Sequence, residues 1–109
     1  MRLESVVLES RYQARLIIKL RRMFPGCIIL KNDGNYLQGV PDLLILWGPR
    51  WASLEVKLSE NSHEQPNQQH YIDLMNKMSF AAFIHPDNEA EVLGALQFAF
   101  ESQGDSCFS

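Results

Sequence analysis

The chain has 109 residues, of which 46% are hydrophobic and 21% charged, which excludes a disordered or collagen-like protein. This length predicts one domain over 1–109, with 103–109 as a flexible tail. No run approaches the ~20 apolar residues of a membrane span, and the first residues lack a signal-peptide core. We therefore expect a cytoplasmic protein with no membrane partner and no small-molecule cofactor.

The net charge of −3 is unevenly distributed along the chain. Residues 1–57 include nine Lys and Arg residues and five Asp and Glu residues, which gives a net charge of +4. Residues 58–109 include one basic residue, Lys77, and eight Asp and Glu residues, which gives a net charge of −7. Because phosphate contacts are local, a basic half can bind nucleic acid even when the whole chain is acidic.

The first part of the chain predicts a helix, a strand and a loop. Apolar residues at roughly helical spacing predict an amphipathic helix over 3–23, which a Pro-Gly pair ends. Its basic side, which includes Arg11 and Arg15, is either a solvated face or a contact with the DNA backbone. A short apolar strand at 27–30 and a turn-rich loop at 31–36 follow.

Two adjacent strands then carry acidic groups among apolar residues. The continuous apolar run 43–47 predicts a strand buried on both faces. After a Gly-Pro-Arg turn, 51–58 predicts a second strand rich in β-formers. In an antiparallel hairpin, Asp42 and Glu55 can converge at one end of the sheet. Glu55 and Lys57 are two residues apart, so they project to the same face.

Two carboxylates and an ammonium on one face are costly without a neutralising partner. Hard cations prefer oxygen ligands, and Mg²⁺ typically takes one or two carboxylates plus substrate phosphate. The alternative is a simple salt bridge from Lys57 to Asp42 or Glu55 at a sheet edge. A Pro-Asp pair before one strand and Glu-Val-Lys at the end of the next favour a metal-competent site.

The second half predicts a loop, a helix, a strand and a last helix, at 59–65, 66–78, 79–85 and 89–101. We interpret His63 in the loop as solvated. The helix at 66–78 is expected to bury a stripe made by Tyr71, Leu74, Met75 and Met78. The last helix has more apolar residues than one stripe needs, so a subunit interface could cover some of them.

The string Gly39-Val40-Pro41-Asp42-Leu43-Leu44-Ile45-Leu46, followed by Leu54-Glu55-Val56-Lys57, resembles the PD-(D/E)XK nuclease superfamily. It is similar in particular to the VRR-NUC branch, which includes small stand-alone phage and bacterial proteins and is related to Holliday-junction resolvases. The resemblance covers most of the chain. It implies an α/β fold with a restriction-endonuclease-like αβββαβα core, a mixed sheet flanked by helices. It also suggests a bacterial or phage-infected host cell as the setting.

The resemblance implies a metal site for Mg²⁺ or Mn²⁺. Asp42, Glu55 and the main-chain carbonyl of Val56 would bind the ion. The first helix of the family contributes a Glu to the site, which matches Glu9 best, with Glu4 as the alternative. Glu9 would lie near or on a second ion.

The resemblance also implies roles around the metal. Lys57 would hold or help deprotonate the attacking water, and Gln68, with Gln69 as second choice, would reach back to the site. A glycine at 39 would permit close approach of metal or DNA. The residues expected to contact nucleic acid are Arg11, Arg15, Lys31, Asn32 and Gln38.

The function implied by the resemblance is a metal-dependent DNA endonuclease that leaves a 5′-phosphate and a 3′-hydroxyl. It would be selective for Holliday junctions or other branched DNA, while flap cleavage and nonspecific nicking stay open. One chain has one site, so cutting two strands together requires a homodimer. The alternatives are a non-catalytic DNA-binding or assembly module on a nuclease fold, and a structural domain with an ion-paired hairpin.

Overall fold

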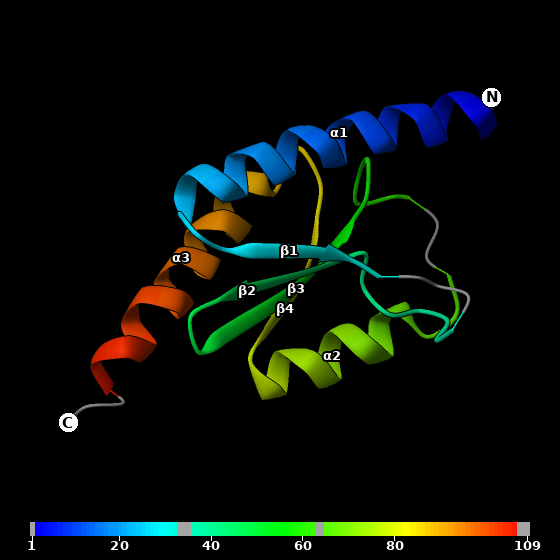
Figure 1. The fold of residues 1–109 in the computed structure, drawn as a ribbon. Helices are drawn as coiled ribbons and strands as arrows, with labels where there is room; N and C mark the ends of the chain where they lie inside the picture. Colours follow the sequence, from blue (N-terminus) through cyan, green and yellow to red (C-terminus); the bar gives the residue numbers. More distant parts are fainter. Residues whose placement is uncertain (1, 33–35, 63–64, 107–109) are drawn as a thin grey trace.

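The computed structural model describes residues 2–32, 36–62 and 65–106, whose elements follow the order αβββαβα (Figure 1). The elements are α1 Arg2–Met23, β1 Ile28–Lys31, β2 Leu43–Trp47, β3 Arg50–Val56, α2 Gln68–Met78, β4 Phe80–Ile84 and α3 Glu89–Ser106. The strands form one sheet in the order β1-β2-β3-β4. The pairs β1–β2 and β2–β3 are antiparallel and β3–β4 is parallel. The α/β class and the mixed sheet flanked by helices are confirmed.

The hairpin of β2 and β3 forms as expected from its turn chemistry. Gly48 in the turn has a φ of 61°, a left-handed conformation that glycine adopts at little cost. The register pairs Leu43 with Leu54, which brings the start of β2 next to the end of β3. Asp42 and Glu55 therefore lie at the same end of the sheet.

The helices divide between the two faces of the sheet, with α1 and α3 on one face and α2 on the other, over β3 and β4 (Figure 1). Side chains alternate along β3, so Leu54 and Val56 enter the core while Glu55 faces α2. From the two helices on the core face and the residue directly after α1, the core includes Tyr12, Leu16, Leu20, Phe24, Val92, Leu93, Leu96 and Phe100. The alternation lets an acidic residue occupy a central strand without entering this core.

An aromatic cluster fixes the end of the hairpin that lies away from Asp42. Phe24 packs against Trp47 and Phe100 with ring centroids 5.1 and 5.0 Å apart, and Trp47 stacks on Phe100 at 5.8 Å. The indole nitrogen of Trp47 donates a hydrogen bond to the Pro25 carbonyl at 3.0 Å. The cluster ties the ends of α1 and β2 to α3.

The expected buried stripe of the second helix is partly wrong. Leu74 is 39% exposed and Met78 is 66% exposed, whereas Ile72 is buried. The helix also begins at Gln68, two residues after Pro66. Since α2 packs over β3 and β4, Leu44 and Leu46 of β2 are only half-buried, not buried on both faces as expected.

The last helix runs to Ser106 and so includes 103–106, which we expected in a flexible tail. The Asp-Gly turn expected at 33–34, the solvated His63 and the final residues 107–109 lie outside the described residues. In the described part of the chain, no helix is both long and apolar enough to span a membrane.

Candidate active site

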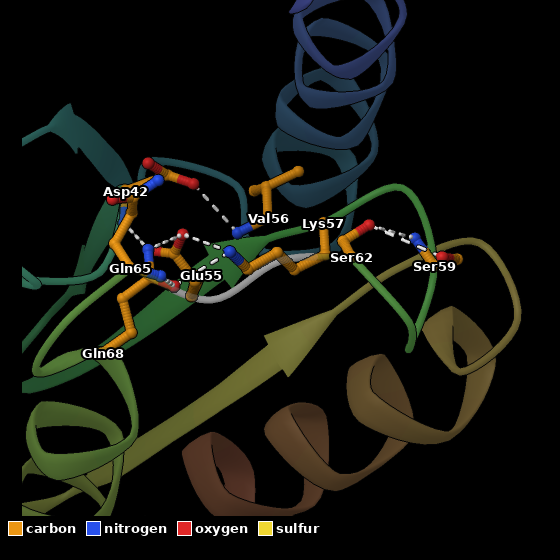
Figure 2. Close-up of polar contacts among 8 residues, drawn as sticks. All are labelled: Asp42, Glu55, Val56, Lys57, Ser59, Ser62, Gln65 and Gln68. Atoms are coloured by element: carbon orange, nitrogen blue, oxygen red, sulfur yellow. Dashed lines mark hydrogen bonds and ion pairs between the residues drawn. The ribbon is translucent and has the colours of Figure 1, made fainter. Parts of the chain in front are cut away.

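Asp42 and Glu55 lie together at the end of the hairpin, where each carboxylate accepts a hydrogen bond from a backbone amide of the neighbouring segment (Figure 2). The Asp42 amide donates to Glu55 Oε1 at 3.1 Å. The Val56 amide donates to Asp42 Oδ2 at 3.0 Å. Amide donors favour the charged form of a carboxylate. This reciprocal pair therefore orients both carboxylates from the backbone itself.

The turn before Asp42 is held by Asn32. Its side-chain amide donates to the Pro41 carbonyl at 2.6 Å, and its backbone amide donates to the Asp42 carbonyl at 2.8 Å. The Asn32 side chain, expected to contact DNA, thus supports the segment that presents Asp42. Lys31, at the end of β1, is exposed.

Gln68 connects Glu55 to Lys57 (Figure 2). Its Nε2 donates to Glu55 Oε2 at 2.8 Å, and its Oε1 accepts from Lys57 Nζ at 2.9 Å. The same oxygen also accepts from the Gln65 amide at 2.9 Å. Lys57 Nζ lies 3.7 Å from Glu55 Oε2. One side-chain amide therefore sets the position of both charged groups.

Gln69, the second choice from the sequence, lies elsewhere. It is exposed and donates to Asp73 Oδ1 on the surface of α2 at 2.9 Å. The structure thus brings Gln68, and not Gln69, to the carboxylate pair.

The N-terminal end of α2 reaches the hairpin because the chain approaches Gly39 closely. Gly39 has a φ of +93°, and a Cβ at this position would lie 2.7 Å from the Pro66 carbonyl oxygen. Asn67, which precedes α2, has a left-handed φ of 72°. The glycine therefore admits the chain's own segment 66–67, where the sequence suggested an approach of metal or DNA.

Burial removes water from the carboxylates of Asp42 and Glu55, and their hydrogen bonds and Lys57 offset only part of the cost of charging them. Burial is the main cause that raises the pKa of Glu55 to about 8, with the Asp42 charge adding to the effect and Lys57 opposing it. Burial also raises the pKa of Asp42, against the opposing effects of the Val56 amide and Lys57. Glu55 is only 4% exposed. A neutralising cation or proton would therefore stabilise this pair.

Glu9 extends the acidic group from α1. It is half-buried, and its pKa is raised by burial and then by the charge of Asp42. Glu4, one turn and more away, is exposed. Within the described residues, no three Asp, Glu, His or Cys side chains converge closely enough to form a metal cluster on their own. Asp42 and Glu55 are thus the directly linked pair, with Glu9 acting through its charge.

The remaining residues expected to bind DNA face solvent. Arg11 and Arg15 are exposed on α1, and Gln38 is exposed before the hairpin. Arg15 borders a hollow of about 330 Å³ in which Lys19 forms an ion pair with Glu89. Part of the basic side of α1 is thus balanced by an acid from α3.

The sequence reasoning missed His85, which follows β4 and is buried. The Lys57 amide donates to the Ile84 carbonyl at 2.9 Å, so parallel pairing continues beyond β3 and sets His85 beside Lys57. A histidine at the end of an apolar strand is the available signal. That His85 lies beside Lys57 follows only from the register of β3 and β4.

Comparison with known proteins finds a likeness in structure but none in sequence. No family model matches the chain, and neither does any curated protein. The fold is similar to that of Archaeoglobus fulgidus Hjc, a Holliday junction resolvase from an archaeal hyperthermophile, with a TM-score of 0.48 and 15% identity. The match covers 70% of this chain and 67% of that one. At this degree of similarity, the α/β fold described above rests on the chain's own strand order and helix positions.

Proposed function

We propose that this protein is a metal-dependent DNA endonuclease that hydrolyses phosphodiester bonds in branched DNA such as Holliday junctions. Its products would carry a 5′-phosphate and a 3′-hydroxyl. The observation that carries the proposal is the pair formed by half-buried Asp42 and buried Glu55, each held by a backbone amide of the other segment, with Gln68 joining Glu55 to Lys57. Buried carboxylates with raised pKa values are concentrated at sites that bind a ligand or catalyse a reaction.

The donor set fits a hard divalent cation. Asp42, Glu55 and Glu9 contribute three negative charges and Lys57 one positive charge, so the fully charged group carries −2. Mg²⁺ or Mn²⁺ would neutralise it, held by Asp42, Glu55 and the Val56 carbonyl, with Glu9 near or on a second ion. Such an ion polarises the scissile phosphate and lowers the pKa of a bound water.

Besides the metal ligands, Lys57 would supply a positive charge at the reacting phosphate and Gln68 would hold Lys57 in position. The Lys57 ammonium has three donor hydrogens and no acceptor, so beside a bound phosphate it can hold the attacking water and offset developing negative charge. Gln68 fixes the direction of that ammonium by accepting one of its hydrogens. The pair keeps the reacting groups oriented before substrate arrives.

A homodimer acting on DNA in the cytoplasm of a bacterial or phage-infected host cell completes the proposal. Two copies would place two sites on the two strands of a junction. Exposed apolar side chains support an interface, among them Ile28 and Leu30 on the edge strand β1 and Phe98 on α3.

The test is cleavage of labelled four-way junction, flap and linear duplex DNA in Mg²⁺, Mn²⁺ or EDTA. We expect metal-dependent cutting that Asp42→Asn and Lys57→Met each reduce by about 10²-fold or more. Lys77→Met, on the exposed surface of α2, is the matched control and should cut normally. Binding without cutting in every metal would identify a non-catalytic DNA-binding module, and neither activity would leave a structural domain.

A further inference from the structure

A small cavity adjoins the candidate active site on the other side of Lys57. Its volume is about 200 Å³, and it is lined by Lys57, Ser59, Glu60, Ser62, Phe83 and His85. Figure 2 shows Ser59 and Ser62 on the side of Lys57 away from Gln68. The Lys57 side chain is therefore a wall shared by the cavity and the carboxylate site.

The parallel pairing of β3 and β4 builds the floor of the cavity. Glu55 pairs with Phe83, and the next residues of the same parity, Lys57 and His85, share that face of the sheet. A turn closes the cavity, because the Ser62 amide donates to the Ser59 carbonyl at 3.2 Å and Ser62 Oγ accepts from the Ser59 amide at 3.2 Å. The lining is thus held by regular backbone structure.

His85 carries an unsatisfied polar atom. The residue is 7% exposed, and its Nδ1 is buried with no hydrogen-bond partner among the described residues. Leaving such an atom unpaired costs free energy, and it belongs to a residue that lines the cavity. The same cavity is lined by Ser59 and Ser62, whose hydroxyls can donate or accept, and by Phe83. The cavity thus combines an aromatic surface with hydrogen-bonding groups of both kinds.

Charge and size narrow the choice of ligand. The Lys57 ammonium is already bonded to Gln68 and close to Glu55, and Glu60 adds a negative charge, so the lining does not favour a phosphate. The volume equals roughly six or seven water molecules at about 30 Å³ each, and it is below the ~300 Å³ typical of sites for larger ligands. A flat, neutral heterocycle with edge donors and acceptors fits these properties.

We propose that this cavity receives one unstacked nucleobase of the DNA strand being cut, beside the scissile phosphate. The inference rests on the proposed function and specifies its substrate: branched DNA in which a nucleotide at the branch is unpaired or unstacked beside the point of cleavage. Stacking of the base on Phe83 and hydrogen bonds from its edge to His85 and Ser62 supply the recognition. Fully paired duplex offers no such base without the cost of unstacking one.

The experiment compares binding of two duplexes, one with a single unpaired 2-aminopurine and one with an abasic site at the same position. Binding is measured in Ca²⁺, which takes oxygen ligands as Mg²⁺ does. We expect about tenfold tighter binding of the 2-aminopurine duplex, together with quenching of its fluorescence. His85→Ala and Ser62→Ala should each bring the affinity ratio toward one. His70→Ala, an exposed histidine on α2, is the control and should keep the ratio.

Ser62→Ala guards against loss of folding, since Ser62 lies in a surface turn and thermal melting reports its stability. Equal affinity for both duplexes overturns the inference even when metal-dependent cleavage occurs. A preference that survives both substitutions also overturns it, because the base would then dock elsewhere. A base preference that both substitutions remove, in a protein that cuts no DNA, supports base binding in this cavity while the nuclease proposal fails. No DNA binding of any kind overturns both.

Discussion

The raised pKa of Glu55 makes the stability of the metal-free protein depend on pH in a specific direction. Burial first and the Asp42 charge second raise this pKa from 4.5 to about 8. A carboxyl whose folded-state pKa is raised stabilises the fold fully below the unfolded pKa, and this contribution is lost as pH rises through the folded pKa. Stability should therefore fall between about pH 5 and pH 8.

The size of the effect follows from about 1.4 kcal/mol per unit of pKa, which gives a loss on the order of a few kcal/mol across this window. For a domain of this length, each kcal/mol moves Tm by about 4–8 °C, so a loss of about 2–4 kcal/mol should lower Tm by roughly 10–30 °C. Glu55→Gln removes the titrating group and should flatten the profile. Glu101→Gln, exposed near the end of α3, is the matched control and should keep it.

The assay is thermal unfolding in EDTA at steps from pH 5 to pH 8, repeated with Mg²⁺ and Mn²⁺. Because a metal competes with the proton for the same carboxylates, the increase in Tm on adding metal should grow with pH. A flat or rising profile for the metal-free protein would refute the reasoning. So would an unchanged slope in Glu55→Gln.

Three further predictions concern single substitutions. Gln68→Leu breaks hydrogen bonds to two buried charged groups and should lower the unfolding free energy by about 1–3 kcal/mol in denaturant titrations, whereas exposed Gln69→Leu should stay within about 0.5 kcal/mol. Gly39→Ala should cost more than about 1 kcal/mol, because its positive φ and close backbone neighbours both oppose a Cβ. Gly94→Ala in α3 meets open space and should stabilise by up to about 1 kcal/mol. Arg11→Gln should reduce the slope of log binding constant against log salt by about 1, and an unchanged slope would exclude a phosphate contact there.

The hairpin could be predicted from local signals. The run 43–47 is bounded by turn residues at both ends, and its predicted bounds are those of β2. Antiparallel pairing of adjacent strands then requires Asp42 and Glu55 to meet. The α/β order followed in the same way from hydrophobic periodicity, with most element ends within two residues.

Long-range packing was less accessible from the sequence. Whether Leu74 and Met78 are buried depends on how far α2 extends over the sheet, which no property of the helix itself determines. Similarly, only the family resemblance ranked Gln68 above Gln69, whereas in the structure the approach of the chain to Gly39 accompanies the placing of Gln68 at Glu55. His85 is the clearest case, because its environment is made by a parallel neighbour some thirty residues earlier in the chain.

The register of β3 and β4 brings the groups proposed for hydrolysis and those proposed for base recognition into one structural unit. Glu55 on β3 and Lys57 directly after it face the same side as Phe83 on β4 and His85 directly after it, so the groups proposed for catalysis and for base binding share one surface of the sheet. A slip of one residue would turn an entire set of side chains to the opposite face. In the observed register, a base in the cavity and a phosphate at the carboxylates would lie on opposite sides of Lys57. Binding of an unpaired base would thereby position the adjacent phosphate, and the proposed selectivity for the DNA structure would then be a consequence of the sheet that builds the site.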